Sequence, residues 1–387
     1  MGESNIKTIN RGLYVTIKVS LRCNLSCDYC YGRDNNCLGD EMNDDEVLKG
    51  LDFICEYAKI KSLNRVFICW HGGEPLIIGN KRLESFLAYA VDLFGKNNIH
   101  CVFGIQTNGL LLNESYYQLI KKYLDSNVGV SIDLFSTFRK YKNGIDSTNI
   151  VKKNIDKAIR SGIRINVINL LTKHNVERIE DIYYYYKKRN IDVRFAMVFP
   201  ISEDYDKSNP MYLTSEEYAK ALCRYFDLWI NDKTPAKNTD IVRLISDMLY
   251  GKPSICLRGK NCQDTYMALS PGGKIFPCAE FDSDEAIIGD FLTQSPREFD
   301  LSKRRREFAS KSPIPISCTN CDYYKICYGS CLRERFVLKH PYRCKSNILY
   351  WNHIVNWLKS RGASLYVLED KSREDKLKLI QDIFAKK

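Results

Sequence analysis

The sequence predicts an α/β fold in which six strand–helix units form a parallel sheet that curls into an incomplete barrel, followed by a cysteine-rich region and C-terminal helices. Two observations support this prediction. Short runs of β-branched and aromatic residues alternate with longer helix-like stretches, as in parallel strands joined by helical crossovers. Cysteines then gather in the last third of the chain. The expected strands span residues 14–20, 66–70, 102–107, 128–133, 164–170 and 193–199.

Amphipathic stretches fill the intervals between these strands. Residues 45–59 and 149–162 show the helical spacing of apolar side chains, and Gly162 suits a C-cap at the end of the second. Further helices are expected at 215–230, 239–251, 347–360 and 372–387. We therefore divide the chain into a barrel, a helical bridge, a cysteine-rich region and a helical tail, at residues 10–213, 214–250, 251–346 and 347–387.

The composition indicates a globular protein of a reducing compartment. Hydrophobic residues make up 44% of the 387 residues, which is ordinary for a folded domain. The first residues, MGESNIKTIN, lack the apolar core of a secretion signal, and no stretch reaches the roughly 20 apolar residues of a membrane span. We therefore expect a cytoplasmic protein without a membrane partner, in which the clustered members of its 16 cysteines serve metal or redox chemistry rather than disulfides.

The formal net charge is +11, but the basic residues form no long arm. The densest run, KRRRE at 303–307, suits a solvated helix surface better than a nucleic-acid site. We therefore expect no nucleic-acid partner, and only a weak general preference for acidic partners.

Three cysteines lie close together directly after the first expected strand. Cys23, Cys27 and Cys30 have C-x3-C-x2-C spacing, and the next histidine in the sequence is His71. A structural zinc site is usually closed by four ligands, whereas three thiolates suit a [4Fe–4S] cluster with one iron open to a small molecule. Ligands in such folds bind at the carboxyl ends of the strands, where this loop is expected to lie. We therefore predict an iron–sulfur cluster at this loop.

Polar residues and glycines follow the next three expected strands. Glycines let the backbone approach a ligand closely, and a carboxylate can pair with an ammonium group. An ordinary rigid turn before Pro75 is the alternative for the first segment. Beside the cysteine loop, these residues predict a binding rim. They are Gly72, Gly73 and Glu74 in WHGGEP, Gln106, Thr107 and Asn108 in QTNG, and Ser131 and Asp133 in SID.

These four motifs together resemble the radical S-adenosylmethionine (SAM) enzymes, over roughly residues 14–200. The resemblance implies a partial (β/α)6 TIM-like barrel. It also implies that SAM binds the open iron through its methionine amine and carboxylate. One electron from the cluster then cleaves SAM to a 5′-deoxyadenosyl radical, which abstracts hydrogen from the substrate.

The same resemblance implies roles for individual residues. Tyr29 would flank the adenine, and Gly72 to Glu74 would hold the methionine amine. Ser131 and Asp133 would reach the carboxylate or ribose region. Two residues that end the fifth expected strand, Asn169 and Leu170, would also face the site. The alternative for each is an ordinary polar or apolar residue at a strand end.

Eight cysteines of the C-terminal third make two sets of four. Zinc ribbons are one alternative, but the spacing resembles the SPASM domain of peptide-modifying radical SAM enzymes, which carries two auxiliary [4Fe–4S] clusters. The resemblance implies three clusters in all. It assigns the eight residues as Cys256, Cys262, Cys278 and Cys331 for the first auxiliary cluster and Cys318, Cys321, Cys327 and Cys344 for the second. Of the other cysteines, Cys55, Cys69, Cys101 and Cys223 are expected in the core, and Cys37 in a polar loop.

Radical SAM enzymes with a SPASM domain mostly modify peptides or proteins, and the sulfatase-maturing enzymes make formylglycine. In those enzymes a Cys-Asp-Phe-Tyr pattern supplies the base, whereas this chain reads Cys278-Ala279-Glu280-Phe281. Alanine cannot take a proton, so Glu280 or Asp282 would have to serve as the base. We therefore expect a different reaction, the oxidative crosslinking (C–C, C–S or C–O) of a ribosomal precursor peptide.

The expected partners are that peptide and an external electron donor, a flavodoxin or a ferredoxin. Three alternatives remain beside the crosslinking reaction. One is formylglycine formation in a sulfatase, and one is oxidation or rearrangement of a small molecule such as a sugar or nucleoside. The last is a non-catalytic iron–sulfur electron carrier.

Overall fold

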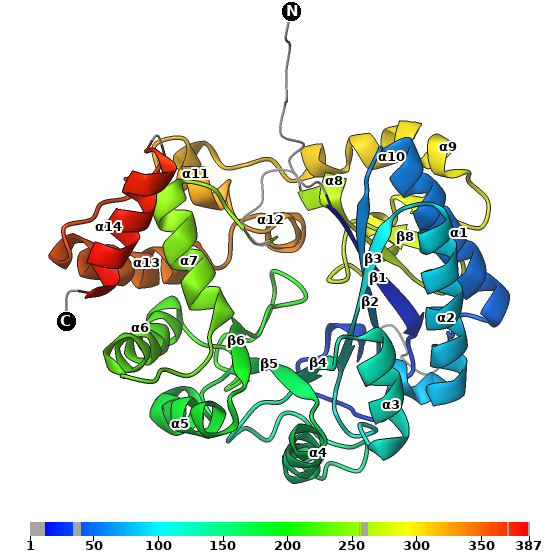
Figure 1. Cartoon of the computed structure of the whole chain (residues 1–387), viewed down its shortest axis with the longest axis horizontal. Helices are drawn as coiled ribbons and strands as arrows, with labels where there is room; N and C mark the ends of the chain where they lie inside the picture. Colours follow the sequence, from blue (N-terminus) through cyan, green and yellow to red (C-terminus); the bar gives the residue numbers. More distant parts are fainter. Residues whose placement is uncertain (1–11, 34–39, 255, 257–261, 370, 386–387) are drawn as a thin grey trace, which may run out of the picture. The chain divides into compact units, whose positions relative to one another are not determined.

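The computed structural model describes residues 12–33, 40–254, 256, 262–369 and 371–385 (Figure 1). The chain forms two compact units. The first comprises Met1–Ser131, Arg139–Ile165 and Gln263–Ser310, and the second comprises Ile132–Phe138, Asn166–Cys262 and Lys311–Lys387. Within the described part of the chain, no helix is long and apolar enough to cross a membrane.

A sheet of parallel and antiparallel strands forms the first unit. Four parallel strands come from the N-terminal half, in the order β4-β3-β2-β1, and β7 continues the sheet in parallel beside β1. Two short antiparallel strands, β8 and β9, complete it. The strands are β1 (Gly12–Ser20), β2 (Arg65–Gly72), β3 (His100–Thr107), β4 (Asn127–Ser131), β7 (Tyr266–Leu269), β8 (Lys274–Phe276) and β9 (Gly289–Asp290). The predicted parallel α/β sheet is confirmed.

Helices cover one face of this sheet. Figure 1 shows α1, α2 and α3 lying along one side of β1, β2 and β3. Alternate residues that face them, such as Val15 and Ile17 on β1 and Ile68 on β2, are buried. Residues between them, such as Tyr14 and His71, stay partly exposed, so the second face of the sheet is more open. The helices of this unit are α1 (Asp44–Ile60), α2 (Asn80–Lys96), α3 (Glu114–Tyr123), α4 (Thr148–Arg160), α9 (Pro296–Leu301) and α10 (Lys303–Arg306).

Local signals in the sequence explain where these helices begin. Asn43 precedes α1 and accepts a hydrogen bond from the Glu46 backbone N–H at 2.9 Å, while the Glu46 carboxylate accepts one from the Asn43 N–H at 2.9 Å. This reciprocal capping box satisfies two N–H groups that a helix otherwise leaves without partners. Ser295 and Glu298 form the same box at the start of α9.

The second unit is built from two parallel strands and a set of helices. β5 (Arg164–Leu171), most of which lies in this unit, pairs in parallel with β6 (Asp192–Met197). Helices α6 and α13 pack together, with Phe226 of α6 against Trp357 of α13 at 5.6 Å between ring centroids. The helices of this unit are α5 (Ile179–Arg189), α6 (Ser215–Asn231), α7 (Thr239–Tyr250), α11 (Tyr324–Cys327), α12 (Leu332–Leu338), α13 (Cys344–Ser360) and α14 (Arg373–Ala385).

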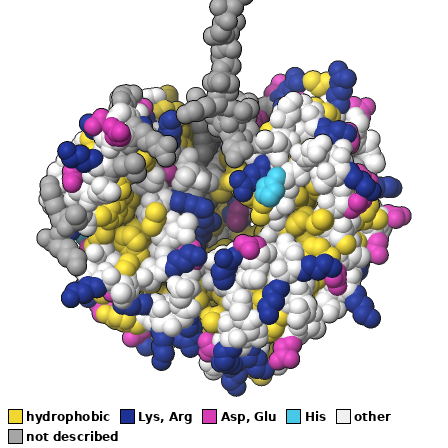
Figure 2. All heavy atoms as spheres, in the orientation of Figure 1, with side chains coloured by type: hydrophobic (Ala, Val, Ile, Leu, Met, Phe, Trp, Pro, Cys, Tyr) yellow, Lys and Arg dark blue, Asp and Glu magenta, His cyan; other side chains and the backbone are white. Residues whose placement is uncertain are grey.

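Short elements link these parts of the chain. They are α8 (Cys262–Thr265) and the 3-10 helices η1 (Tyr31–Arg33), η2 (Pro75–Ile78), η3 (Val176–Arg178), η5 (Asp284–Ala286), η6 (Phe308–Lys311) and η7 (Ile316–Cys318). Residues 263–310 belong to the compact unit that contains β1. The four-part division expected from the sequence cuts the chain elsewhere and stays a prediction. Figure 2 shows Lys and Arg side chains spread among Asp and Glu on the face in view, so they form no single basic patch there.

Candidate active site

The loop that carries Cys23, Cys27 and Cys30 follows β1 directly, as predicted. Cys27 is buried, Cys23 is half-buried and Cys30 is exposed, and none of these three residues forms a disulfide. The Cys30 N–H donates to the Cys27 carbonyl at 3.1 Å, which folds the end of the loop into a turn. Burial raises the pKa of Cys23 to about 11, which favours the protonated thiol; a cation such as iron would have to displace this proton in order to bind.

Two hydrogen-bond donors point at the Cys23 sulfur. The Leu25 backbone N–H lies 3.4 Å from Sγ, and the Asn108 side-chain amide lies 3.7 Å from it. Donors of this kind stabilise a thiolate and tune the potential of an iron–sulfur cluster. Among the described residues, no three His, Cys, Asp or Glu side chains are grouped so as to hold a single metal ion.

Gly72 and Gly73 allow β2 to lie against the start of the cysteine loop. A Cβ on Gly73 would stand 2.4 Å from the Arg22 carbonyl oxygen and 2.5 Å from that of Leu21. Gly72 has φ of 140° and its Cβ would meet the Ser20 oxygen at 2.0 Å. The Gly73 N–H donates to the Ser20 carbonyl at 2.8 Å, so the close approach is also a hydrogen-bonded one. The two glycines thus serve the packing of backbone on backbone.

Glu74 is fully buried and joins two of the predicted motifs. Its Oε1 accepts hydrogen bonds from the Thr107 hydroxyl at 2.7 Å and from the Leu76 N–H at 3.0 Å, and its Oε2 accepts one from the Asn108 N–H at 2.7 Å. Burial raises the pKa of Glu74, and these three hydrogen bonds oppose the rise. The carboxylate thus holds the GGEP and QTNG segments together, with both oxygens already engaged.

Other predicted residues of the first unit also lie around the cysteine loop. The Asn108 amide donates to Asn24 Oδ1 of the loop at 2.7 Å. The Gln106 amide donates to the Ser131 hydroxyl at 2.9 Å, which links the ends of β3 and β4. The Tyr29 hydroxyl accepts a hydrogen bond from Arg139 at 3.0 Å. The structure therefore brings residues from three strand ends and the loop into one hydrogen-bonded region.

Sequence reasoning missed the residues that support the cysteine loop from outside the motifs. The Lys140 carbonyl accepts a hydrogen bond from the Ser26 N–H at 2.8 Å, and the Lys140 ammonium pairs with the Asp28 carboxylate at 2.8 Å. Arg139 holds Tyr29 as described above. These two basic residues follow the SID motif in a segment without helical or strand periodicity, so the sequence carried no signal for their contacts.

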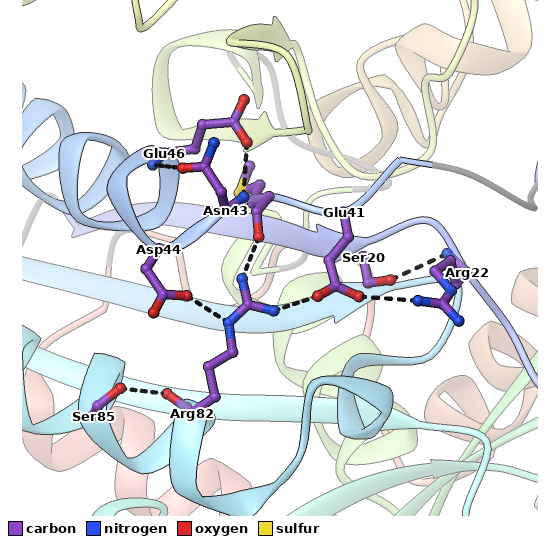
Figure 3. Close-up of polar contacts among 9 residues, drawn as sticks. Ser20, Arg22, Glu41, Asn43, Asp44, Glu46, Arg82 and Ser85 are labelled. Atoms are coloured by element: carbon purple, nitrogen blue, oxygen red, sulfur yellow. Dashed lines mark hydrogen bonds and ion pairs between the residues drawn. The ribbon is translucent and has the colours of Figure 1, made fainter.

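A polar network on α1 and α2 anchors the start of the same loop (Figure 3). Arg82 of α2 pairs with Glu41 and, at 2.6 Å, with Asp44. Glu41 in turn lies 4.0 Å from Arg22, and the Leu21 N–H donates to the Asp40 carbonyl at 2.8 Å. The segment that leads into α1 is thereby fixed to the first residues of the cysteine loop.

Three of the predicted SAM contacts belong to the second unit. Asp133 is buried and accepts a hydrogen bond from the Leu170 N–H at 2.8 Å. Asn169 is buried too, and its Oδ1 accepts from the Tyr186 hydroxyl at 2.8 Å and from the Leu134 N–H at 3.3 Å. Leu170 is half-buried. The structure brings these three residues together as an internal network, and their contact with SAM stays a prediction.

The two candidate bases follow β8 in the first unit. Residues 279 and 280 form a turn, in which Glu280 is exposed and Asp282 is half-buried. The Glu280 charge raises the pKa of His71, whereas burial and the Lys18 ammonium lower it more strongly. Glu280 therefore acts electrostatically on β2, next to the cysteine loop. Ala279 contributes only its backbone, whose carbonyl accepts a hydrogen bond from the Tyr31 hydroxyl at 3.2 Å.

One of the two C-terminal cysteine sets lies around a single cavity. Cys318, Cys321, Cys327 and Cys344 line a space of about 30 Å³ in the second unit. Of the other set, Cys278 belongs to the first unit and Cys256, Cys262 and Cys331 belong to the second. Cys55 is buried as expected, while Cys69, Cys101 and Cys223 are half-buried. Cys37 lies outside the described residues.

A larger cavity of about 130 Å³ also lies within the second unit, among β6, α6, α7 and α13. Its charged groups are paired, since Arg194 binds Asp240 through two hydrogen bonds of 2.8 and 3.1 Å and Arg343 pairs with Glu334. Most of the other side chains that line this cavity are aromatic or aliphatic.

Comparison with known proteins places these features in a family. Residues 17–186 match the Radical SAM superfamily. The serine-type anaerobic sulfatase-maturating enzyme of Bacteroides thetaiotaomicron is 27% identical over 387 aligned positions, which cover 89% of this chain and 90% of that enzyme. The cysteine-type anaerobic sulfatase-maturating enzyme of Clostridium novyi is 27% identical over 339 positions, covering 84% and 89%.

Solved structures show the same fold. The structure of anSMEcpe with bound AdoMet and a Cp18Cys peptide superposes with a TM-score of 0.78 at 21% identity, over 90% of this chain and 98% of that one. The structure of Streptococcus suis SuiB bound to S-adenosylmethionine superposes with a TM-score of 0.59 at 17% identity, over 86% and 74%.

The curated relatives correct the expected function. The sequence led us to expect a crosslinking maturase of a ribosomal peptide, because Ala279 replaces the aspartate of the sulfatase-maturing pattern. Both relatives described above are instead sulfatase-maturating enzymes, and each aligns over most of this chain. The crosslinking prediction is therefore wrong, and formylglycine formation, the first alternative, is favoured. One replaced residue was too narrow a basis on which to place another reaction ahead of formylglycine formation.

Proposed function

We propose that this chain, which carries a radical SAM domain and is a radical SAM enzyme, oxidises a serine or cysteine residue of a sulfatase to formylglycine. The observation that carries the proposal is the alignment with a serine-type and a cysteine-type sulfatase-maturating enzyme over more than four-fifths of the chain. The substrate is then a peptide segment of a protein rather than a small metabolite.

The residues around the cysteine loop fit an iron–sulfur cluster with SAM. The three thiols lie at one strand end, and two donors point at Cys23. Bound there, SAM and the clusters would supply the radical that removes one hydrogen atom from the substrate Cβ and the acceptor for a second electron. An external flavodoxin or ferredoxin would reduce the enzyme.

The chain's own residues would hold SAM around this loop. Tyr29, fixed by Arg139, would flank the adenine, and the linked Gln106 and Ser131 would face the carboxylate or ribose. Since both oxygens of Glu74 are engaged, we assign the contact with the methionine amine to the backbone carbonyls of residues 72–74. Thr107 and Asn108 act through Glu74 and Cys23. Asp133, Asn169 and Leu170 remain candidates from the second unit.

Two auxiliary clusters are also part of this proposal. The cavity lined by Cys318, Cys321, Cys327 and Cys344 supports one of them. The other would use Cys256, Cys262, Cys278 and Cys331, whose residue types and spacing support it. The second electron of the reaction would leave through these clusters.

The remaining chemical step is loss of a proton from the substrate hydroxyl or thiol. Loss of one hydrogen atom, one electron and this proton converts the serine side chain into an aldehyde. Cysteine would give a thioaldehyde, which water converts to the same aldehyde with release of hydrogen sulfide. We assign the proton to Glu280 before Asp282, because Glu280 is exposed and its charge acts on His71.

The test is an assay of the reconstituted enzyme under anaerobic conditions with two peptides that differ only in a central serine or cysteine. Mass spectrometry should detect an aldehyde in at least one peptide, and fragmentation should place it at the central residue. The Cys27→Ala variant should lose the reaction, whereas Cys223→Ala, which changes a half-buried cysteine of α6, should keep it. SAM cleavage without any change in either peptide would instead point to a small-molecule substrate.

A further inference from the structure

Lys18 is a buried lysine on the more open face of the first sheet. It lies on β1 directly opposite His71 of β2, and its side chain is 4% exposed. Its Nζ donates a hydrogen bond to the Phe281 carbonyl at 2.8 Å. The ammonium also lies 5.6 Å from the ring centroid of Tyr31 and 5.4 Å from that of Phe276. A buried charge costs free energy unless such contacts compensate it, so this lysine has a defined place in the structure.

Tyr31 holds the same segment from the cysteine loop. It begins η1 directly after Cys30, and its hydroxyl donates to the Ala279 carbonyl at 3.2 Å. The carbonyls of Ala279 and Phe281, the residues before and after Glu280, are therefore bound by two side chains. Tyr31 of the loop binds the first and Lys18 of β1 binds the second. The Phe281 N–H closes the turn on the Cys278 carbonyl at 3.3 Å, and the Phe281 ring is buried against Phe308.

This arrangement determines where the Glu280 side chain can point. In a strand, neighbouring side chains face opposite ways, so Glu280 would not point in the direction of residue 279. Residues 279 and 280 form a turn instead. Tyr31 binds the peptide group that precedes Glu280, the Phe281 N–H fixes the one that follows it, and Lys18 binds the next carbonyl, that of Phe281. The Glu280 side chain is exposed, and the direction in which it leaves the chain is set by this backbone.

We propose that Lys18 and Tyr31 are positioning residues, which clamp the backbone on both sides of Glu280 and so aim its carboxylate at the substrate. The inference rests on the proposed function, because the clamp matters for the reaction only if Glu280 accepts the proton of the substrate. The clamp itself is a claim about the backbone of residues 279–281. It connects the first strand and the cysteine loop to the segment that follows Cys278.

Enzyme kinetics with combined substitutions test the purpose of the clamp. Lys18→Met and Tyr31→Phe should lower kcat for aldehyde formation by about 10- to 100-fold, since small misplacements of a reacting group have effects of that size. KM for the peptide and SAM cleavage should change little. Lys18→Arg, which can still donate to the Phe281 carbonyl, should restore part of the rate. Lys274→Met removes an exposed lysine of β8 that pairs with Asp284 at 3.0 Å, and serves as the matched control.

The decisive comparison is made in a Glu280→Gln background. If the clamp acts through Glu280, adding Lys18→Met or Tyr31→Phe to Glu280→Gln should cause no further loss of rate. A further loss equal to that seen in the wild-type background would overturn the proposal, because the two residues would then act independently of Glu280.

Hydrogen–deuterium exchange of the reconstituted protein tests the clamp without any substrate. Amides of residues 279–283 should exchange several-fold faster in Lys18→Met and Tyr31→Phe, and at the wild-type rate in Lys274→Met and Glu280→Gln. Unchanged exchange in both clamp variants would overturn the proposal. If the wild-type enzyme oxidises neither the serine nor the cysteine peptide, the proposed function fails, and exchange still decides whether the clamp exists.

Discussion

The Glu74→Gln substitution tests whether Glu74 holds two loops together or contacts a ligand. The carboxylate accepts three hydrogen bonds, two on Oε1 and one on Oε2. Glutamine offers one oxygen and one NH2 group. In its less costly orientation the amide oxygen keeps Leu76 and Thr107 as donors, and the NH2 group then faces the Asn108 N–H. That buried N–H loses its acceptor.

The expected cost follows from this count. Leaving one buried donor unsatisfied costs about 1–3 kcal/mol, so we take about 2 kcal/mol for Glu74→Gln. A loss of ~1 kcal/mol lowers the melting temperature of a domain of this size by roughly 2–4 °C. The variant should therefore melt about 4–8 °C below the wild type.

The assay is thermal unfolding followed by circular dichroism on anaerobically reconstituted proteins of equal iron content. Glu84→Gln is the matched control, since Glu84 makes an exposed ion pair with Lys122 at 3.3 Å, and such pairs contribute little to stability. SAM cleavage is measured on the same samples. A normal melting temperature together with lost SAM binding would refute our reasoning and would place the Glu74 carboxylate on the ligand.

Three more predictions concern the cysteines and the glycines. Replacing Cys318 and Cys321 by Ala should lower the bound iron by about four atoms, the content of one cubane, whereas Cys223→Ala should leave the iron content unchanged. Equal iron in the wild type, the double variant and Cys223→Ala would exclude a cluster in the cavity that Cys318 and Cys321 line. Gly73→Ala should displace the cysteine loop, because its Cβ would stand 2.4 Å from the Arg22 oxygen. The variant should lose both cluster iron and SAM cleavage, and Gly95→Ala on α2 is the control. Full SAM cleavage would show that the loop adapts. Gly104→Val should fold normally, since a Cβ at this position meets nothing within 4 Å. Its side chain would occupy space on the more open face of β3, so we expect peptide oxidation to fall while SAM cleavage continues. An unchanged rate of peptide oxidation would place the substrate elsewhere.

The fold could be predicted from local patterns. The alternation of strands and helices and the position of the cysteine loop depend on residues close together in the sequence, and the structure confirms the parallel sheet. The β7 strand was not expected beside β1. Its run YMAL is short, and its pairing with residues 14–17 joins segments far apart in the chain, which periodicity does not reveal.

The motifs pointed to residues that lie around the cysteine loop, but not to the partners of those residues, and the roles of these residues in binding SAM stay a prediction. The motifs identified Glu74 and Asn108 correctly as neighbours of the cysteine loop. The sequence suggested that Glu74 pairs with a ligand, because a carboxylate beside two glycines resembles a binding group. Two of its three donors, Thr107 and Asn108, come from the end of β3, more than thirty residues away, and only the folded backbone brings them together with Glu74.

The cysteine loop itself has little regular structure, so its shape depends on contacts from outside. Gly73 and Glu74 hold it by their backbone N–H groups, Asn108 binds Asn24, and Lys140 holds Ser26. These contacts are made by protein groups alone, so they support the loop in addition to any bond that its thiolates make to a metal. A substitution among these supporting residues should therefore weaken the cluster even though it removes no ligand.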